Sequence, residues 1–213
     1  MATEFTLYCF AQSGNAYKAA LMLNLCGADW TPRFVDFFGG ETRTPAYRAI
    51  NVMGEVPVLE HRDLRLSQSG VILDHLAHCL GRFDWADEAG RREVLRWLLW
   101  DNHKLTSYIA TLRFLMQFAS EPNPAVVEMF RGRALAALKI LETQLTGRDW
   151  VALDTPSIAD LSLCGYLWYE REFGVDWADY PAIRAWLSRL EAMPGWQPPY
   201  TLMPGHPLPS GRG

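Results

Sequence analysis

The chain of 213 residues lacks any long apolar run and any cluster of basic residues. No apolar stretch reaches the roughly 20 residues of a membrane-spanning helix, so we expect no membrane segment. The net charge is −4 and no basic run alternates with aromatic residues, which makes nucleic acid an unsuitable partner. Residues 1–5 show neither the basic nor the apolar part of a secretory signal. These absences favour a cytoplasmic protein.

Cysteine is scarce, and its spacing suggests neither disulfides nor a metal site. The four cysteines are Cys9, Cys26, Cys79 and Cys164. They form no Cys-x-x-Cys pair, and none lies near a histidine at typical zinc-site spacing. Each has apolar neighbours, so all four are predicted to lie in the core. His61, His75 and His78 show no ligand pattern either, and we therefore predict no metal.

The first 80 residues alternate between strand-like and helix-like patterns. Short apolar or alternating segments predict strands at 5–10, 31–37, 56–60 and 64–66. Helical spacing of apolar residues predicts helices at 16–26, 45–50 and 69–80. The order is βαβ, then a helix, then ββα. This order matches an α/β thioredoxin-like domain.

Two short segments of this region predict a binding site. Val56-Pro57 opens an apolar strand, an unusual place for a residue that cannot donate to a sheet ladder. A cis bond there would leave the Val56 N–H and C=O free to pair with an extended peptide. Gln68 and Ser69 stand where the next strand ends and a helix begins, and unpaired N–H groups there suit a carboxylate. Together they predict a site for a small acidic peptide.

No strand pattern recurs after residue 87. Helical patterns cover 88–118, 125–145 and 181–193. Ser157 and Asp160 form a predicted capping box at the start of another helix. The tail from Pro194 is rich in proline and glycine, and we expect it to be loose. The chain is therefore predicted to have two domains, an α/β domain at 1–80 and an all-α domain at 88–200.

Several motifs in this order resemble the cytosolic glutathione transferase family, over nearly the whole chain. They are Leu7-Tyr8 leading into 13–18, 51–54 before Val56-Pro57, 66–76, and Pro156 to Asp160. Each motif alone is common, but the ordered set with a helical second domain is specific. The resemblance is to bacterial members of a serine-type or related class. It implies the GST fold, a homodimer, and no metal or organic cofactor beyond glutathione as co-substrate.

The resemblance also implies how glutathione is held in the first domain. The implied glutathione-binding residues are Val56, Pro57, Gln68 and Ser69. The Val56 backbone would pair with the cysteinyl unit, and Gln68 and Ser69 would hold the γ-glutamyl carboxylate. Glu55 departs from the family, which often has lysine, glutamine or another polar residue there for the glycyl carboxylate. An acid would repel that carboxylate, so either Glu55 points away, or Arg43 or an arginine of the partner subunit takes over the role.

The chemistry requires a thiolate, whereas a free thiol has a pKa of about 8.5. Ser13, just ahead of the first helix, is our leading candidate for stabilising the sulfur, with Asn15 as a second donor. Either residue also suits a helix N-cap, and both roles are compatible. Tyr8 is the runner-up, as in tyrosine-type classes. Cys9 would make a cysteine-type enzyme, but a buried thiol is the better interpretation.

A small hydrophobic electrophile is the implied second substrate, bound between the domains. Trp100, His103 and Tyr108 are candidates to contact it, although an aromatic stripe at helical spacing more often packs in a core. The predicted function is thus a glutathione transferase active in detoxification, attacking an electrophile or a disulfide. The alternatives are a glutathione-dependent disulfide reductase and a non-catalytic binding protein of the same fold.

Overall fold

The chain divides into two units in a computed structural model that describes residues 4–207. Within that range, the first unit comprises 4–82 and 193–207, and the second comprises 83–192. The predicted end of the second domain at 200 is therefore wrong. Residues after Ala192 belong with the first unit, because their backbone is held there by hydrogen bonds.

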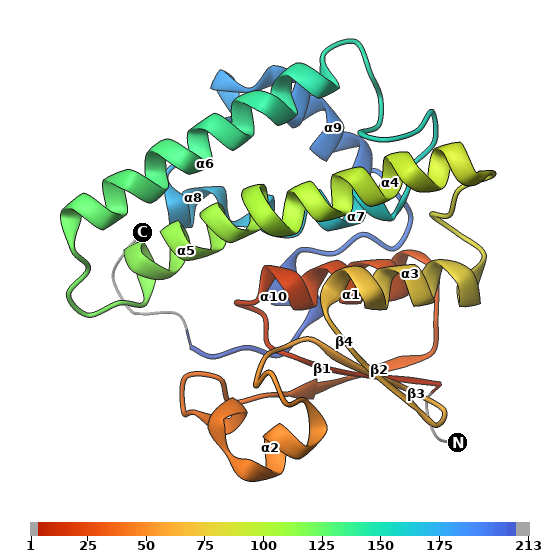
Figure 1. Ribbon diagram of the computed structural model, residues 1–213, viewed down its shortest axis with the longest axis vertical. Coiled ribbons are helices and arrows are strands. Elements are labelled where there is room, and N and C mark those ends of the chain that lie inside the picture. Colours follow the sequence, from red (N-terminus) through yellow and green to blue (C-terminus); the bar gives the residue numbers. More distant parts are fainter. Residues whose placement is uncertain (1–3, 208–213) are drawn as a thin grey trace. The chain divides into compact units, whose positions relative to one another are not determined.

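A mixed four-stranded sheet forms the centre of the first unit, in the order β2-β1-β3-β4 (Figure 1). The strands are β1 (Phe5–Cys9), β2 (Trp30–Phe34), β3 (Val58–His61) and β4 (Leu64–Ser67). β1 runs parallel to β2 and antiparallel to β3, and β3 runs antiparallel to β4. The βαβ-α-ββα order predicted from the sequence is confirmed.

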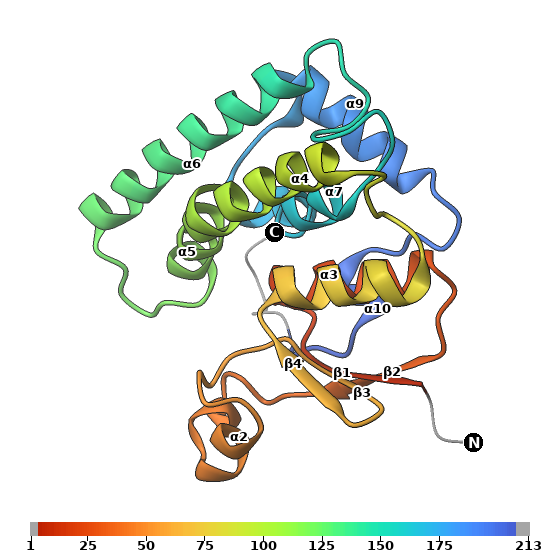
Figure 2. The same ribbon diagram turned by 45° about the vertical axis from the view of Figure 1, so that its right-hand side comes forward.

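Helices cover both faces of this sheet (Figures 1 and 2). The helices of this unit are α1 (Gly14–Leu25), α2 (Pro45–Ile50), α3 (Ser69–Leu80) and α10 (Pro199–Leu202), with a 3₁₀ turn at Glu41–Arg43. α1 and α3 lie side by side on one face, and α2 lies on the other. Because side chains alternate along a strand, Tyr8 packs with Tyr47 of α2, whereas its neighbour Cys9 is directed to the opposite face.

The tail is ordered by hydrogen bonds to α1 and to the loop before it. Tyr17 donates from its hydroxyl to the Gln197 carbonyl at 2.7 Å, and Ala11 N–H donates to the Pro204 carbonyl at 2.8 Å. Gly195 permits the close approach, since a Cβ there would lie 2.8 Å from the Asn24 carbonyl oxygen. The prediction of a loose tail is thus wrong for 194–207, while residues 208–213 lie outside the described range.

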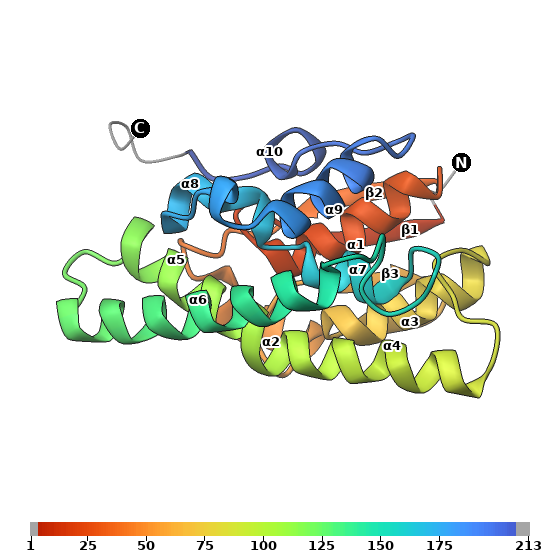
Figure 3. The ribbon, with the colours of Figure 1, turned by 90° about the horizontal axis from the view of Figure 1, so that it is seen from above.

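The second unit is all-helical, as predicted (Figure 3). Its helices are α4 (Glu88–Trp100), α5 (Thr106–Gln117), α6 (Pro124–Leu145), α7 (Ile158–Leu163), α8 (Glu170–Phe173) and α9 (Pro181–Glu191), with 3₁₀ turns at Leu167–Tyr169 and Trp177–Asp179. α6 packs along α5 and also contacts α9, and α4 packs on α7. Among the described residues, no helix is both long and apolar enough to cross a membrane.

The predicted single helix 88–118 is interrupted by a π-helical segment, Asp101–Leu105, between α4 and α5. Asp101 is fully buried and accepts hydrogen bonds from the hydroxyls of Thr106, at 2.8 Å, and Ser162, at 2.6 Å. A buried carboxylate needs such donors, and the wider turn presents it to them. The predicted capping box of α7 is present, with Ser157 and Asp160 each bonding the other's backbone. Asp160 is therefore a helix cap.

Candidate functional site

Ser13 starts α1 and caps it. Its backbone is extended, its side chain accepts a hydrogen bond from Ala16 N–H at 3.2 Å, and only 6% of the residue is exposed. A hydroxyl has one proton to donate and two lone pairs, so accepting from Ala16 leaves the proton available. The first turn of a helix also favours a negative charge. The predicted cap and the predicted sulfur donor are therefore chemically compatible in one side chain.

Asn15, in the first turn of α1, meets Ser69 at the start of α3. The Ser69 hydroxyl donates to Asn15 Oδ1 at 3.4 Å, and Ser69 is buried while Asn15 is partly exposed. These residues lie 54 positions apart in the sequence. The contact joins the start of α1 to the start of α3. The first was predicted to hold the sulfur, and the second the γ-glutamyl carboxylate.

Gln68, which precedes α3, has an unusual backbone conformation. Its φ of 70° and ψ of 117° lie in a region that non-glycine residues rarely adopt. Such a residue persists only where its surroundings hold it, often at a ligand site. Its side-chain amide donates to Glu55 Oε2 at 3.2 Å and lies 2.9 Å from Met53 Sδ. Gln68 therefore connects the α3 start to the segment before Val56.

The Val56-Pro57 bond is cis, and the chain before it is held on both sides. The Glu55 carbonyl accepts from the Tyr47 hydroxyl at 3.0 Å and from Asn51 Nδ2 at 2.9 Å. Within residues 4–207, the Val56 N–H and C=O have no hydrogen-bond partner. A fixed segment with free backbone groups is what docking an extended peptide requires.

Glu55, Tyr47 and Asn51 are the residues that sequence reasoning placed poorly. The Glu55 carboxylate is directed to Gln68, and what binds the glycyl carboxylate stays a prediction. Tyr47 was not singled out and Asn51 was noted only as part of the 51–54 motif, although both fix the Glu55 carbonyl. Gly54 was the signal in the sequence that could have drawn attention to this turn. It has a φ of 66°, and a Cβ there would lie only 2.8 Å from the backbone oxygen of Thr42.

Tyr8, the alternative sulfur donor, has its hydroxyl engaged elsewhere. It donates to Glu60 Oε1 at 3.1 Å, and Arg65 binds the same carboxylate oxygen at 2.7 Å. The Arg33 guanidinium lies over the Tyr8 ring, 4.4 Å from its centre. A hydroxyl with one proton, already donated to a carboxylate, has none left for a sulfur.

The cysteines differ in their exposure. Burial raises the pKa of Cys9 to about 12, so its thiol stays protonated and is a poor nucleophile. Cys164 is buried as predicted, whereas Cys26 is only partly buried. The prediction that all four lie in the core is wrong for Cys79, which is exposed. Its side chain is exposed near the end of α3, although its apolar sequence neighbours suggested burial.

The predicted second-substrate residues lie along the α4–α5 stretch of the second unit. Trp100 packs edge-on against Trp97 at 5.3 Å, and His103 is exposed in the π-helical segment. The Tyr108 hydroxyl accepts from Lys104 Nζ at 3.3 Å. Trp100 and Tyr108 therefore have packing or hydrogen-bonding partners within this unit, and they remain predictions as substrate contacts.

The expectation that the histidines form no ligand group is also wrong. His61, His75 and Cys79 bring their ligand atoms within 4.8 Å of one another. His75 and Cys79 are four residues apart on α3, a spacing that places two metal ligands on one helix face and that the sequence-based prediction missed. His61 comes from β3, so only the fold brings it to them. His78 is not part of this group.

Models of known families match both halves of this chain. Residues 3–78 match the glutathione S-transferase N-terminal domain, and residues 104–194 match the glutathione S-transferase C-terminal domain. The chain therefore belongs to the glutathione S-transferase family, and the thioredoxin-like plus all-α fold agrees with this. By family, the protein is an enzyme of the glutathione transferase class.

Individual proteins support the same conclusion. The crystal structure of a glutathione S-transferase from Pseudomonas fluorescens is 34% identical, with a TM-score of 0.86, covering 92% of this chain and 99% of that one. The disulfide-bond oxidoreductase YfcG of Escherichia coli is 25% identical over 192 residues, 87% of this chain and 89% of that protein. Ure2p in complex with glutathione shares the fold, with 22% identity, a TM-score of 0.83 and coverage of 91% and 96%.

Proposed function

We propose that the first unit binds reduced glutathione and that Ser13 and Asn15 hold its sulfur as a thiolate for attack on an electrophilic carbon. One observation carries this proposal. Hydrogen bonds from Ser69 to Asn15 and from Gln68 to Glu55, beside Val56, join three separately predicted segments into one continuous surface. The glutathione complex of a structural neighbour is consistent with this assignment.

The thiolate is stabilised by a hydrogen bond and by the dipole of α1, without a basic side chain. The Ser13 hydroxyl donates to the sulfur while it accepts from Ala16 N–H, and the start of α1 adds a favourable field. The thiol proton passes to solvent, and the thiolate then forms the carbon–sulfur bond as the leaving group departs with the bonding electrons. The protein's own residues supply orientation and electrostatic stabilisation, and we propose no metal or organic cofactor for this step.

The remaining contacts follow from charge. The cysteinyl unit pairs with the free Val56 backbone next to Pro57, and Ser69 with the first N–H groups of α3 receives the γ-glutamyl carboxylate. The γ-glutamyl unit also has an ammonium group. Glu55, whose carboxylate lies beside Gln68, is suitably charged to receive it. This arrangement would account for an acid at a position where the family often has lysine, glutamine or another polar residue.

Binding and conjugation test the proposal directly. We expect retention on glutathione resin, a calorimetric signal on titration with glutathione, and glutathione-dependent conjugation of a chloronitroarene. Ser69→Ala should weaken glutathione binding, whereas the matched variant Ser67→Ala, two residues earlier in β4, should not. Absence of glutathione binding would refute the enzyme and favour the non-catalytic binding protein of the same fold. Binding without conjugation of any electrophile would refute the transferase reaction.

Disulfide reduction is the second candidate function. The 25% identical relative named a disulfide-bond oxidoreductase, together with Asn15 beside Ser13, favours it. Bound glutathione thiolate would attack the substrate disulfide, and a second glutathione would then release the mixed disulfide, giving oxidised glutathione and two reduced thiols. Cys9 is buried and protonated, so Cys9→Ser should retain the rate on a model disulfide. Comparing that rate with the chloronitroarene rate decides which reaction dominates.

The remaining assignments rest on the family. We propose a cytoplasmic homodimer, which light scattering of the purified protein tests. A small hydrophobic electrophile is the proposed second substrate, and Trp100, His103 and Tyr108 are its candidate contacts. Replacing each by alanine should raise KM for the electrophile without changing glutathione affinity if the residue makes such a contact.

A further inference from the structure

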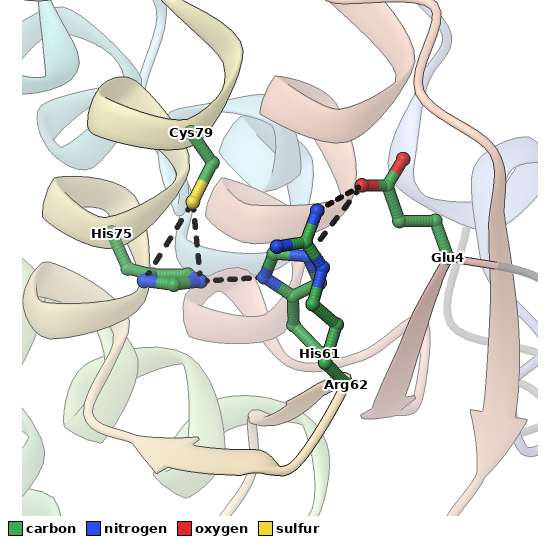
Figure 4. A network of polar contacts seen from close by, with 5 residues as sticks. All are labelled: Glu4, His61, Arg62, His75 and Cys79. Atoms are coloured by element: carbon green, nitrogen blue, oxygen red, sulfur yellow. Dashed lines mark hydrogen bonds and ion pairs between the residues drawn. The ribbon is translucent and has the colours of Figure 1, made fainter.

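Three side chains of types that can ligate metals converge in the first unit (Figure 4). None of them is among the residues proposed to hold glutathione. We call His61, His75 and Cys79 the His–His–Cys cluster. His61 ends β3, and His75 and Cys79 lie one turn apart on α3. The nearest approaches are 2.9 Å between His61 Nδ1 and His75 Nε2, and 3.5 Å between that His75 nitrogen and Cys79 Sγ.

These separations are close to those around a tetrahedral metal ion. Metal–nitrogen bonds of about 2.05 Å and metal–sulfur bonds of about 2.3 Å place two nitrogens about 3.3 Å apart, and nitrogen and sulfur about 3.6 Å apart. The nearest separations in the cluster are 2.9 Å and 3.5 Å. All three ligand atoms lie within 4.8 Å of one another. The two His rings contact each other directly at 2.9 Å, so binding an ion requires the rings to move apart and Cys79 to close in.

The Glu4 carboxylate lies behind the His61 ring, on the side away from the cluster. It is 3.5 Å from His61 Nε2, on the side of the ring opposite His75, as Figure 4 shows. His61 is only 4% exposed, and among residues 4–207 its Nε2 has no hydrogen-bond partner. The same Glu4 oxygen also lies 3.8 Å from the Arg62 guanidinium. The Phe5 ring packs against His61 with centres 4.3 Å apart. A carboxylate behind a histidine keeps the proton on the distal nitrogen and the lone pair toward the metal.

We propose that the His–His–Cys cluster binds a divalent cation of the zinc class, with Glu4 supporting His61. Two imidazole nitrogens and one thiolate suit a borderline-soft ion and disfavour calcium or magnesium, which take oxygen ligands. Cys79 is exposed and His75 partly exposed, so a fourth position is open to water or to an external ligand. Binding displaces the thiol proton to the buffer and involves no oxidation or reduction.

Cobalt(II) titration of the whole, untagged protein tests this proposal. The protein is reduced and then transferred to buffer free of glutathione and chelators, since both bind the ion. We expect one equivalent of cobalt to produce a thiolate-to-cobalt charge-transfer band and the visible bands of tetrahedral coordination, and we expect zinc to abolish them. Cys79→Ser should remove the charge-transfer band. Glu4→Gln should keep the band and weaken binding by about 10- to 100-fold.

Two variants control for incidental binding. Cys26→Ser removes another partly exposed thiol of the same unit, and His78→Ala removes an exposed histidine of the same helix. Both should bind cobalt as the unaltered protein does. The proposal is overturned if the unaltered protein shows no thiolate band, if the band survives Cys79→Ser, or if His75→Ala leaves the affinity unchanged. Circular dichroism of each variant confirms that it is folded.

Discussion

Replacing Ser13 by alanine removes both of its proposed roles. The hydroxyl caps α1 through Ala16 N–H and is proposed to donate to the glutathione sulfur. Losing the cap should cost about 1 kcal/mol of unfolding free energy. Losing a hydrogen bond to a charged group costs about 1.5–3 kcal/mol. That range corresponds to about one to two pKa units of the bound thiol, and hence roughly 10- to 100-fold less thiolate below its pKa.

Two matched variants isolate the catalytic part of this loss. Asn123→Ala removes a neutral cap that accepts from Ala125 N–H at 2.9 Å in the second unit, whereas every proposed glutathione contact belongs to the first unit. It should lower stability by a similar amount and leave kcat/KM unchanged. Ser13→Thr keeps the hydroxyl and should retain most of the activity.

The assay is the pH profile of chloronitroarene conjugation, read together with the thiolate absorbance of bound glutathione and with urea unfolding. In Ser13→Ala, the lower inflection of the profile should move to higher pH, and raising the pH should restore part of the lost rate. An unshifted profile with a rate loss no larger than that of Asn123→Ala would show that Ser13 is only a cap. In that case Asn15 would have to stabilise the sulfur.

Three further predictions follow from individual contacts. Glu55→Gln should raise KM for glutathione about two- to five-fold with kcat unchanged, as expected for an exposed charge pair. A lower KM would instead show that Glu55 repels the glycyl carboxylate. Burial raises the pKa of Cys9 to about 12, so above pH 9 the unfolded chain loses this proton while the folded chain keeps it. The free energy of unfolding should therefore fall by about 1.4 kcal/mol per pH unit above pH 9. Cys9→Ala should show a smaller fall between pH 9 and pH 10, measured by urea unfolding. Glu172→Gln should lower unfolding free energy by about 3 kcal/mol, because Arg113 is 2% exposed and binds Glu172 Oε2 at 2.7 Å; a change below 1 kcal/mol in thermal or urea unfolding would contradict this.

Local chemistry explains why much of the first unit was predictable. Strand alternation, helical spacing and proline at Val56-Pro57 act through neighbouring residues, so they can be read directly from the sequence. Ser13 and Ser157 were identified as possible caps because a cap depends on the next few residues of its own helix. The ordered motifs then indicated the family, which the comparisons with known proteins confirmed.

What the sequence could not supply are contacts between distant segments. Local pattern did not reveal that Ser69 bonds Asn15 or that Glu55 faces Gln68, because each pair meets only after the sheet and its helices pack together. The tail looked loose because it is rich in proline and glycine, yet hydrogen bonds to the Tyr17 side chain of α1 and to the Ala11 backbone before it order the tail.

The amino-acid sequence thus determined the element order, the helix caps and the segments proposed to hold glutathione, since these depend on residues close together in the chain. Tertiary structure alone decided the exposure of Cys79 and the meeting of His61 with His75 and Cys79. The β3–β4 hairpin returns the chain to α3, and this return brings His61 within 2.9 Å of a histidine 14 residues later.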